Sequence, residues 1–118
     1  MRVTSWASER IAEPVSVADL AEVGAVSVAS LHRAFRAELG TTPLAWLTAQ
    51  RVDRARELLE QTAMPVEAVA RASGLGSAAN LRRRFREASG ATPTQHRRQF
   101  GTTTPTRAQP SAGRQATG

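Results

Sequence analysis

The sequence predicts an all-α fold of about seven helices, in which two similar lobes are joined by a long linker helix. Apolar residues recur at helical spacing over residues 4–100, and no stretch alternates as a strand would. Residues 27–43 recur as residues 77–93, with the same framework of Ser, Leu, Phe, Gly and Thr-Pro. Between the copies, residues 43–61 form one uninterrupted helical pattern. Together these patterns indicate one helical unit used twice.

The first lobe, at about residues 4–41, is expected to begin with two helices. Trp6, Ala7 and Ile11 predict a helix over 4–13 that ends before Pro14. Ser16-Val-Ala-Asp19 resembles a capping box with Asp in place of Glu, and it begins a short helix at 17–23. The residues expected to be buried on this second helix are Val17, Leu20 and Ala21.

The third helix of the first lobe is expected at 28–39. A tight turn at 24–26 precedes it, Ser27 caps it, and Gly40 is a natural residue to end it. Its predicted buried stripe is Leu31, Phe35 and Leu39. The spacing of that stripe fixes which side chains of the helix point outward.

The linker helix is expected at about 43–61. Thr42-Pro43 combines an N-cap with proline in the first helical position, and Met64-Pro65 ends the pattern. Its predicted apolar face consists of Leu44, Leu47, Ala55, Leu58 and Leu59.

The second lobe, at about 66–100, repeats the first. A short helix at 66–72, a turn at Gly74-Leu-Gly76 and a helix at 77–88 are followed by Gly90, and Thr92-Pro93 opens a last helix to about Phe100. Its expected core residues are Val66, Val69, Ala70, Leu81 and Phe85, and Trp6, Trp46, Phe35 and Phe100 are also expected in the cores. Residues 101–118 contain no apolar residue larger than alanine, so we expect a disordered tail.

Composition limits the possible functions. The 118 residues carry a net charge of +6, which favours nucleic acid or an anionic surface as the partner. All sixteen basic residues are arginine, a residue suited to bidentate phosphate and guanine recognition, but we attribute the absence of lysine to genome base composition. The absence of cysteine excludes disulfides, cysteine-ligated zinc and thiol catalysis. No membrane span, signal peptide, catalytic motif or cofactor fingerprint is recognisable. We therefore expect a cytoplasmic protein that is no enzyme, with no cofactor, no metal, no membrane partner and no evident effector site.

A short helix, a turn and a capped longer helix form a helix-turn-helix arrangement, whose second helix enters the DNA major groove. If the stripe of the third helix points inward, its outward residues are Ala29, His32, Arg33 and Arg36. The corresponding outward residues of the second copy are Ala79, Arg82, Arg83 and Arg86. Counting charges over each copy gives the second lobe the stronger positive face.

The length of the linker predicts how the two lobes could dock. About 19 helical residues span roughly 28 Å, whereas successive major grooves on one side of B-DNA lie roughly 34 Å apart. The two outward helices could thus occupy adjacent grooves as a monomer. If the span falls short, either the DNA bends or only one lobe docks fully.

The chain resembles the DNA-binding domain of the AraC/XylS family of bacterial transcription regulators from about Trp6 to Phe100. The motifs that carry the resemblance are Val69-Ala70, Gly74-Leu-Gly-Ser77, Leu81-Arg-Arg-Arg-Phe-Arg86 and Gly90-Ala-Thr-Pro93. The linker, Thr42-Pro43-Leu-Ala-Trp-Leu-Thr-Ala-Gln-Arg51, is similar to the branch whose full-length members carry an amidotransferase-like N-terminal domain. The resemblance implies binding to promoter DNA, and RNA polymerase as a partner if the protein is an activator.

The resemblance assigns base contacts to Ala29, His32 and Arg33 in the first lobe and to Ala78, Ala79, Arg82 and Arg83 in the second. Two positions depart from the family pattern. Ala29 replaces a large or basic side chain and can at most touch a thymine methyl group. Ala25 stands where the turn usually has glycine.

A second group of residues is expected to contact phosphate. It consists of Ser27, Arg36, Thr42, Arg51, Ser77, Arg86 and Thr92. The threonines are first of all helix caps. For Arg51, pairing with Asp53 or Glu57 is an equally open alternative, and Arg84 faces either phosphate or solvent. His96 is expected on the surface or near the DNA backbone.

Three other functions are possible for a chain of this composition. A helical protein-interaction module would need an exposed apolar groove rather than arginine-rich outward faces. An enzyme would need a site that no motif here indicates. An RNA-binding protein would have to accommodate the narrow A-form major groove, which suits this helix arrangement poorly.

Overall fold

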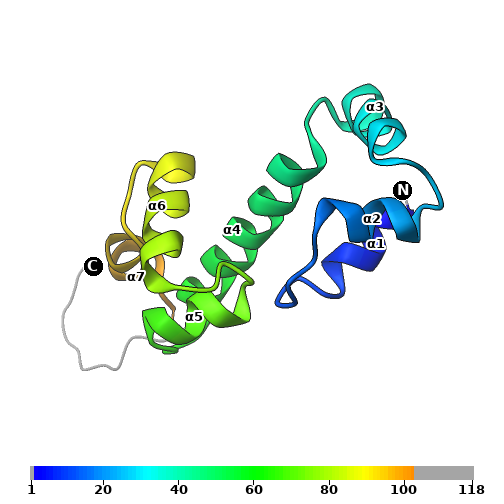
Figure 1. Ribbon diagram of the computed structural model, residues 1–118. Coiled ribbons are helices and arrows are strands. Elements are labelled where there is room, and N and C mark those ends of the chain that lie inside the picture. Colours follow the sequence, from blue (N-terminus) through cyan, green and yellow to red (C-terminus); the bar gives the residue numbers. More distant parts are fainter. Residues whose placement is uncertain (1, 103–118) are drawn as a thin grey trace.

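Seven helices and no strand make up residues 2–102, which are the residues that the computed structural model of this protein describes (Figure 1). The helices are α1 (Arg2–Ser8), α2 (Val17–Val23), α3 (Val28–Leu39), α4 (Pro43–Gln61), α5 (Val66–Ala72), α6 (Ala78–Ser89) and α7 (Pro93–Phe100). The molecule is elongated, 56 × 23 × 23 Å, because the two lobes lie at opposite ends of α4. The predicted fold class is confirmed.

Each lobe has its own hydrophobic core. The core of the first lobe comprises Val3, Ala7, Leu20, Ala21, Leu31, Phe35 and Leu47. The core of the second comprises Val52, Ala55, Leu58, Leu59, Val69, Ala70, Leu75, Leu81 and Phe85. No residue belongs to both, although α4 contributes to each. The repeated phenylalanines Phe35 and Phe85 occupy equivalent places and are both 0% exposed.

The helix starts follow the predicted caps. The side-chain oxygens of Ser27, Thr42, Ser77 and Thr92 each accept a hydrogen bond from the backbone N–H three residues later, at 3.1 Å. Ser16 and Asp19 form the expected reciprocal capping box. These bonds satisfy N–H groups that have no partner within the helix, which is why the observed boundaries lie so close to the predicted ones.

The first helix differs from its prediction of 4–13, since α1 begins at Arg2 and ends at Ser8. Beyond Ser8 the backbone makes tighter bonds from Arg10 N–H to Ala7 O and from Glu13 N–H to Arg10 O, both 3.0 Å long. The apolar pattern continues to Ile11 because that residue packs against the first core from this loop. The helical spacing of the apolar residues up to Ile11 therefore indicates burial and not a continuous helix. The other α-helix bounds agree with the predicted ones to within one residue.

Three side chains predicted to be buried are instead largely exposed. Leu39 is 44% exposed, Leu44 59% and Phe100 51%. Leu39 and Leu44 flank the connection between α3 and α4, and no described element covers either of them. The periodicity placed these residues on the apolar faces of their helices, but a side chain is buried only where another element packs against that face.

His96 is buried, which corrects the expectation of a surface position. Only 8% of the residue is exposed, its Nε2 atom lies 2.7 Å from Oε2 of Glu60, and its ring packs against that of Phe85. The chain remains packed beyond α7, because the backbone N–H and the hydroxyl of Thr102 both donate to the Glu60 carbonyl. Of the predicted disordered tail, residues 103–118 lie outside the described residues.

Candidate nucleic-acid interface

The two helix-turn-helix turns are similar but unequal. In the first, Ala25 adopts the left-handed conformation with φ 57°, and Val26 N–H donates to Ala21 O. In the second, Gly74 and Gly76 both have φ 88°. The turn between α2 and α3 spans 24–27, one residue fewer than the turn between α5 and α6 at 73–77. A position that suits glycine is thus filled by alanine in the first lobe.

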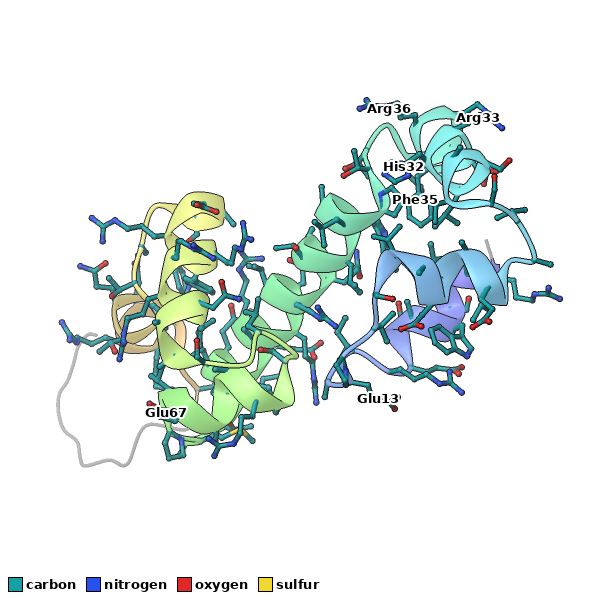
Figure 2. All side chains as sticks on the ribbon, viewed as in Figure 1. Glu13, His32, Arg33, Phe35, Arg36 and Glu67 are labelled. Carbon is teal, nitrogen blue, oxygen red and sulfur yellow. The ribbon has the colours of Figure 1, made fainter. Side chains whose placement is uncertain are left out.

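The outward face of α3 matches the prediction for three of its four residues. Ala29, Arg33 and Arg36 are exposed, whereas His32 is half-buried with Nδ1 3.0 Å from Val28 O. Figure 2 shows Arg33 and Arg36 extending from the outer side of α3, while Phe35 points toward the interior of the lobe. The half-buried ring leaves His32 less surface for a base contact than the two arginines have.

The outward face of α6 is richer in arginine. Ala79, Arg82, Arg83 and Arg86 are all exposed, as predicted from the spacing. Ala78 is only 5% exposed and packs into the lobe, which leaves little of its side chain for the base contact that the family resemblance implies. Ala78 is the first residue of α6, and its side chain continues the buried stripe that Leu81 and Phe85 form.

Two neighbouring polar residues hold the central arginines. Nη2 of Arg33 donates to the Ser30 hydroxyl at 2.9 Å, and Nη2 of Arg83 donates to Oδ1 of Asn80 at 2.8 Å. The Asn80 amide also donates to Leu75 O, at 2.9 Å, so it joins Arg83 to the preceding turn. Sequence reasoning missed Ser30 and Asn80. The available signal was a polar residue three positions before the arginine in both copies.

The four capping hydroxyls lie at the positions where phosphate contacts were expected. Ser27 and Ser77 are exposed at the N-termini of α3 and α6, and Thr42 and Thr92 are half-buried at those of α4 and α7. Each oxygen already accepts a backbone hydrogen bond, so its capping role is established. The positive end of the helix dipole remains available to an anion at each site.

Arg51 pairs with neither Asp53 nor Glu57, the acidic residues considered as its partners. Its Nε donates to Ile11 O at 3.2 Å and its Nη2 to Glu13 O at 2.8 Å, so the side chain joins α4 to the loop that follows α1. Burial lowers the pKa of Arg51 from its usual value, by desolvation of the guanidinium. These two bonds hold the side chain against the first lobe, and the phosphate contact of Arg51 stays a prediction.

The remaining charged residues refine the picture of α6. Nη1 of Arg84 lies 3.5 Å from Oε1 of Glu87 on the same helix, so this arginine is partly neutralised.

Within residues 2–102, no cluster of His, Asp or Glu could hold a metal ion. No helix in that part of the chain is long and apolar enough to cross a membrane.

Residues 20–99 match the family model of a helix-turn-helix domain. Among curated proteins, the arabinose operon regulatory protein of Escherichia coli is 33% identical over 81 residues, covering 69% of this chain and 28% of that protein. The regulator CdhR of Pseudomonas aeruginosa is 37% identical over 84 residues, covering 71% and 25%. The chain therefore spans only a quarter to two fifths of the length of the first curated relatives that it matches.

Among solved structures, the DNA-binding domain of AdpA in complex with a target DNA superposes with a TM-score of 0.81 and 36% identity. The superposition covers 84% of this chain and 89% of that domain. Nothing in these matches bears on the expected branch with an amidotransferase-like domain. The fold of two helix-turn-helix units with an intervening helix thus has a counterpart that was solved on DNA.

Proposed function

Because the chain belongs to the AraC/XylS family of helix-turn-helix DNA-binding domains, we propose that it is a sequence-specific transcription regulator that inserts α3 and α6 into adjacent major grooves of promoter DNA. One observation carries the proposal: two equivalent capped helices present exposed arginines from opposite ends of one linker helix. RNA polymerase is an expected partner if the protein is an activator.

The dimensions of the molecule support docking in two grooves. The 19 residues of α4 span roughly 28 Å along the helix axis. The whole molecule is 56 Å long, which exceeds the roughly 34 Å repeat of the major groove. A modest bend of the DNA would make up the difference between linker length and groove spacing.

We assign base recognition chiefly to Arg33 and Arg83. Both are exposed near the middle of their helices, and a hydrogen bond to a neighbouring side chain limits the orientations of each guanidinium. An arginine held in this way can present two parallel donors to O6 and N7 of guanine. Ala29, Ala79, His32 and Arg82 lie on the same faces and complete the proposed base contacts.

We assign phosphate contacts to Arg36 and Arg86, together with the N-termini capped by Ser27, Thr42, Ser77 and Thr92. Arg36 and Arg86 lie in the last turns of their helices, beyond the residues expected to meet base edges. Such contacts depend on charge rather than on sequence. They would make binding weaken steeply as salt concentration rises.

The first experiment is to select bound sites from random double-stranded DNA and then to measure their affinity at several salt concentrations. We expect a two-part site whose footprint spans two major grooves, and an affinity that falls as salt rises. Binding without sequence preference, or without salt dependence, would reject the regulator function. A footprint limited to one groove would reject two-lobed docking alone.

A pair of variants tests the division between base and phosphate contacts. Arg83→Ala should weaken binding to the selected site by about 1–3 kcal/mol and relax the preference at one base pair. Arg86→Ala should weaken all sequences alike and lower the salt slope by about one. Both variants remove one exposed charge from the same helix, so they control for each other. If Arg83→Ala weakened binding to selected and to random DNA equally, the assignment of Arg83 to a base contact would be contradicted.

A further inference from the structure

One turn of α4 belongs to neither hydrophobic core. Leu47 is the last α4 residue in the core of the first lobe, and Val52 is the first in the core of the second. Residues 48–51 lie between them. Two lobes joined through so little shared packing are expected to move relative to one another, unless another contact restrains them.

Arg51 provides such a contact at the end of this turn. Its guanidinium is bonded through Nε to Ile11 O and through Nη2 to Glu13 O, and both carbonyls belong to the first lobe. Arg51 itself immediately precedes Val52 of the second core. The side chain therefore binds the first lobe to the part of α4 that is fixed in the second.

Gly74, in the turn before α6 of the second lobe, lies against Arg51 and the Ile11 carbonyl. A Cβ atom on Gly74 would overlap the carbonyl oxygen of Ile11 and would lie 2.7 Å from Nε of Arg51. The loop after α1 and the turn before α6 are therefore in direct contact, and Figure 1 shows them side by side below α4. We call this contact of Arg51, Gly74 and the carbonyls of Ile11 and Glu13 the interlobe junction.

The junction lies close to the start of a recognition helix. Gly74 is in the turn that positions α6, and Asn80 of α6 is bonded to Leu75 O of that same turn. Movement at the junction would therefore change the direction of α6 relative to the first lobe. The two cores themselves would stay intact, because Arg51, Gly74 and Glu13 belong to neither core and Ile11 joins the junction only through its carbonyl.

We propose that Arg51 is a positioning residue that fixes α3 relative to α6 and thereby sets the one spacing of half-sites that the protein accepts. The inference rests on the proposed two-groove docking. Inserting one base pair between half-sites moves the second by about 3.4 Å and rotates it by roughly 35°. A restrained pair of lobes cannot follow that displacement, whereas a hinged pair can.

The first test uses the free protein, so its result does not depend on DNA binding. The chain has no cysteine, so spin labels can be attached to Ala37→Cys in α3 and Ala88→Cys in α6, both at exposed positions. Pulsed electron paramagnetic resonance should give a narrow distribution of label-to-label distances for the labelled protein with Arg51 intact. The distribution should become broad after Arg51→Ala. Arg71→Ala, which removes an exposed arginine beside the junction, should leave the distribution narrow. An equally narrow distribution after Arg51→Ala would overturn the inference.

The second test measures DNA spacing. One base pair inserted into the selected site should reduce wild-type affinity on the order of tenfold or more, but the affinity of Arg51→Ala by less than about threefold. If Arg51 instead contacts phosphate, Arg51→Ala would weaken binding at every spacing alike, and the inference fails. If the wild-type protein selects sites of a single groove, two-lobed docking fails and the distance measurement alone decides the role of Arg51.

A glycine pair gives the same information without removing Arg51. Gly74 and Gly76 both have φ 88°, but a Cβ on Gly76 would meet nothing within 4 Å. Gly74→Ala and Gly76→Ala therefore share the backbone strain, and only Gly74→Ala disturbs the junction. We expect a broad distance distribution and relaxed spacing for Gly74→Ala alone. Identical behaviour of the two variants would overturn the inference.

Discussion

Replacing Ala25 by glycine should stabilise the first lobe. Ala25 has φ 57°, a left-handed conformation that costs an L-residue roughly 1–2 kcal/mol because its Cβ crowds the backbone. Glycine would relieve that cost but would lose about 0.4–1 kcal/mol through the greater entropy of the unfolded chain. The Ala25 side chain is exposed, so its removal leaves no cavity. The difference of the two terms is a net gain of about 0–1.6 kcal/mol, and its midpoint of about 0.8 kcal/mol corresponds to roughly 3–6 °C in Tm for a domain of this size.

Tryptophan fluorescence is the appropriate assay. Both tryptophans of the chain, Trp6 and Trp46, pack against the core of the first lobe, so their signal reports unfolding there. Ala37→Gly is the matched control, since it makes the same chemical change at an exposed position inside α3, where glycine should cost about 1 kcal/mol. A lower Tm for Ala25→Gly would refute the argument from backbone strain.

Two further changes test the second lobe. Phe85→Ala removes a side chain that is 0% exposed and should lower the free energy of unfolding by about 3–5 kcal/mol. Helicity measured by circular dichroism should then be lost at a lower temperature. The unfolding transition seen by tryptophan fluorescence should shift less, because both tryptophans report on the separate first core. Thr92→Ala removes the oxygen that accepts from Gln95 N–H at 3.1 Å and should cost about 1 kcal/mol in denaturant unfolding. An unchanged midpoint would mean that this helix cap contributes nothing to stability.

The parts of the fold that were predictable are those encoded locally. Ser27, Thr42 and Thr92 each lie immediately before a predicted helix, and a cap needs only residues within its own first turn. The exposed faces of α3 and α6 followed from the spacing of Leu and Phe for the same reason. Two residues on these faces were exceptions: His32, which the spacing placed outward, is half-buried, and Ala78, which was taken from the family resemblance, is buried.

The parts that were not predictable depend on partners distant in the sequence. Arg51 is bonded to residues about forty positions earlier, and His96 to Glu60, thirty-six positions earlier. Neither bond leaves a local pattern, so an arginine on a helix near acidic residues suggested an ordinary surface role. The bonds of Arg51 to the carbonyls of Ile11 and Glu13 also account for the early end of α1, because the loop that carries these carbonyls had been predicted to be helical.

The inequality of the two lobes has a consequence for the direction in which the protein would lie on a promoter. The turn before α3 is one residue shorter than that before α6, and serine in one copy replaces asparagine in the other beside the central arginine. A single chain with two different reading ends would require a site without inverted symmetry. Inverting such a site within a promoter would turn the bound molecule to face the opposite way. One bound molecule would therefore distinguish upstream from downstream, which a symmetric dimer on a palindrome cannot do.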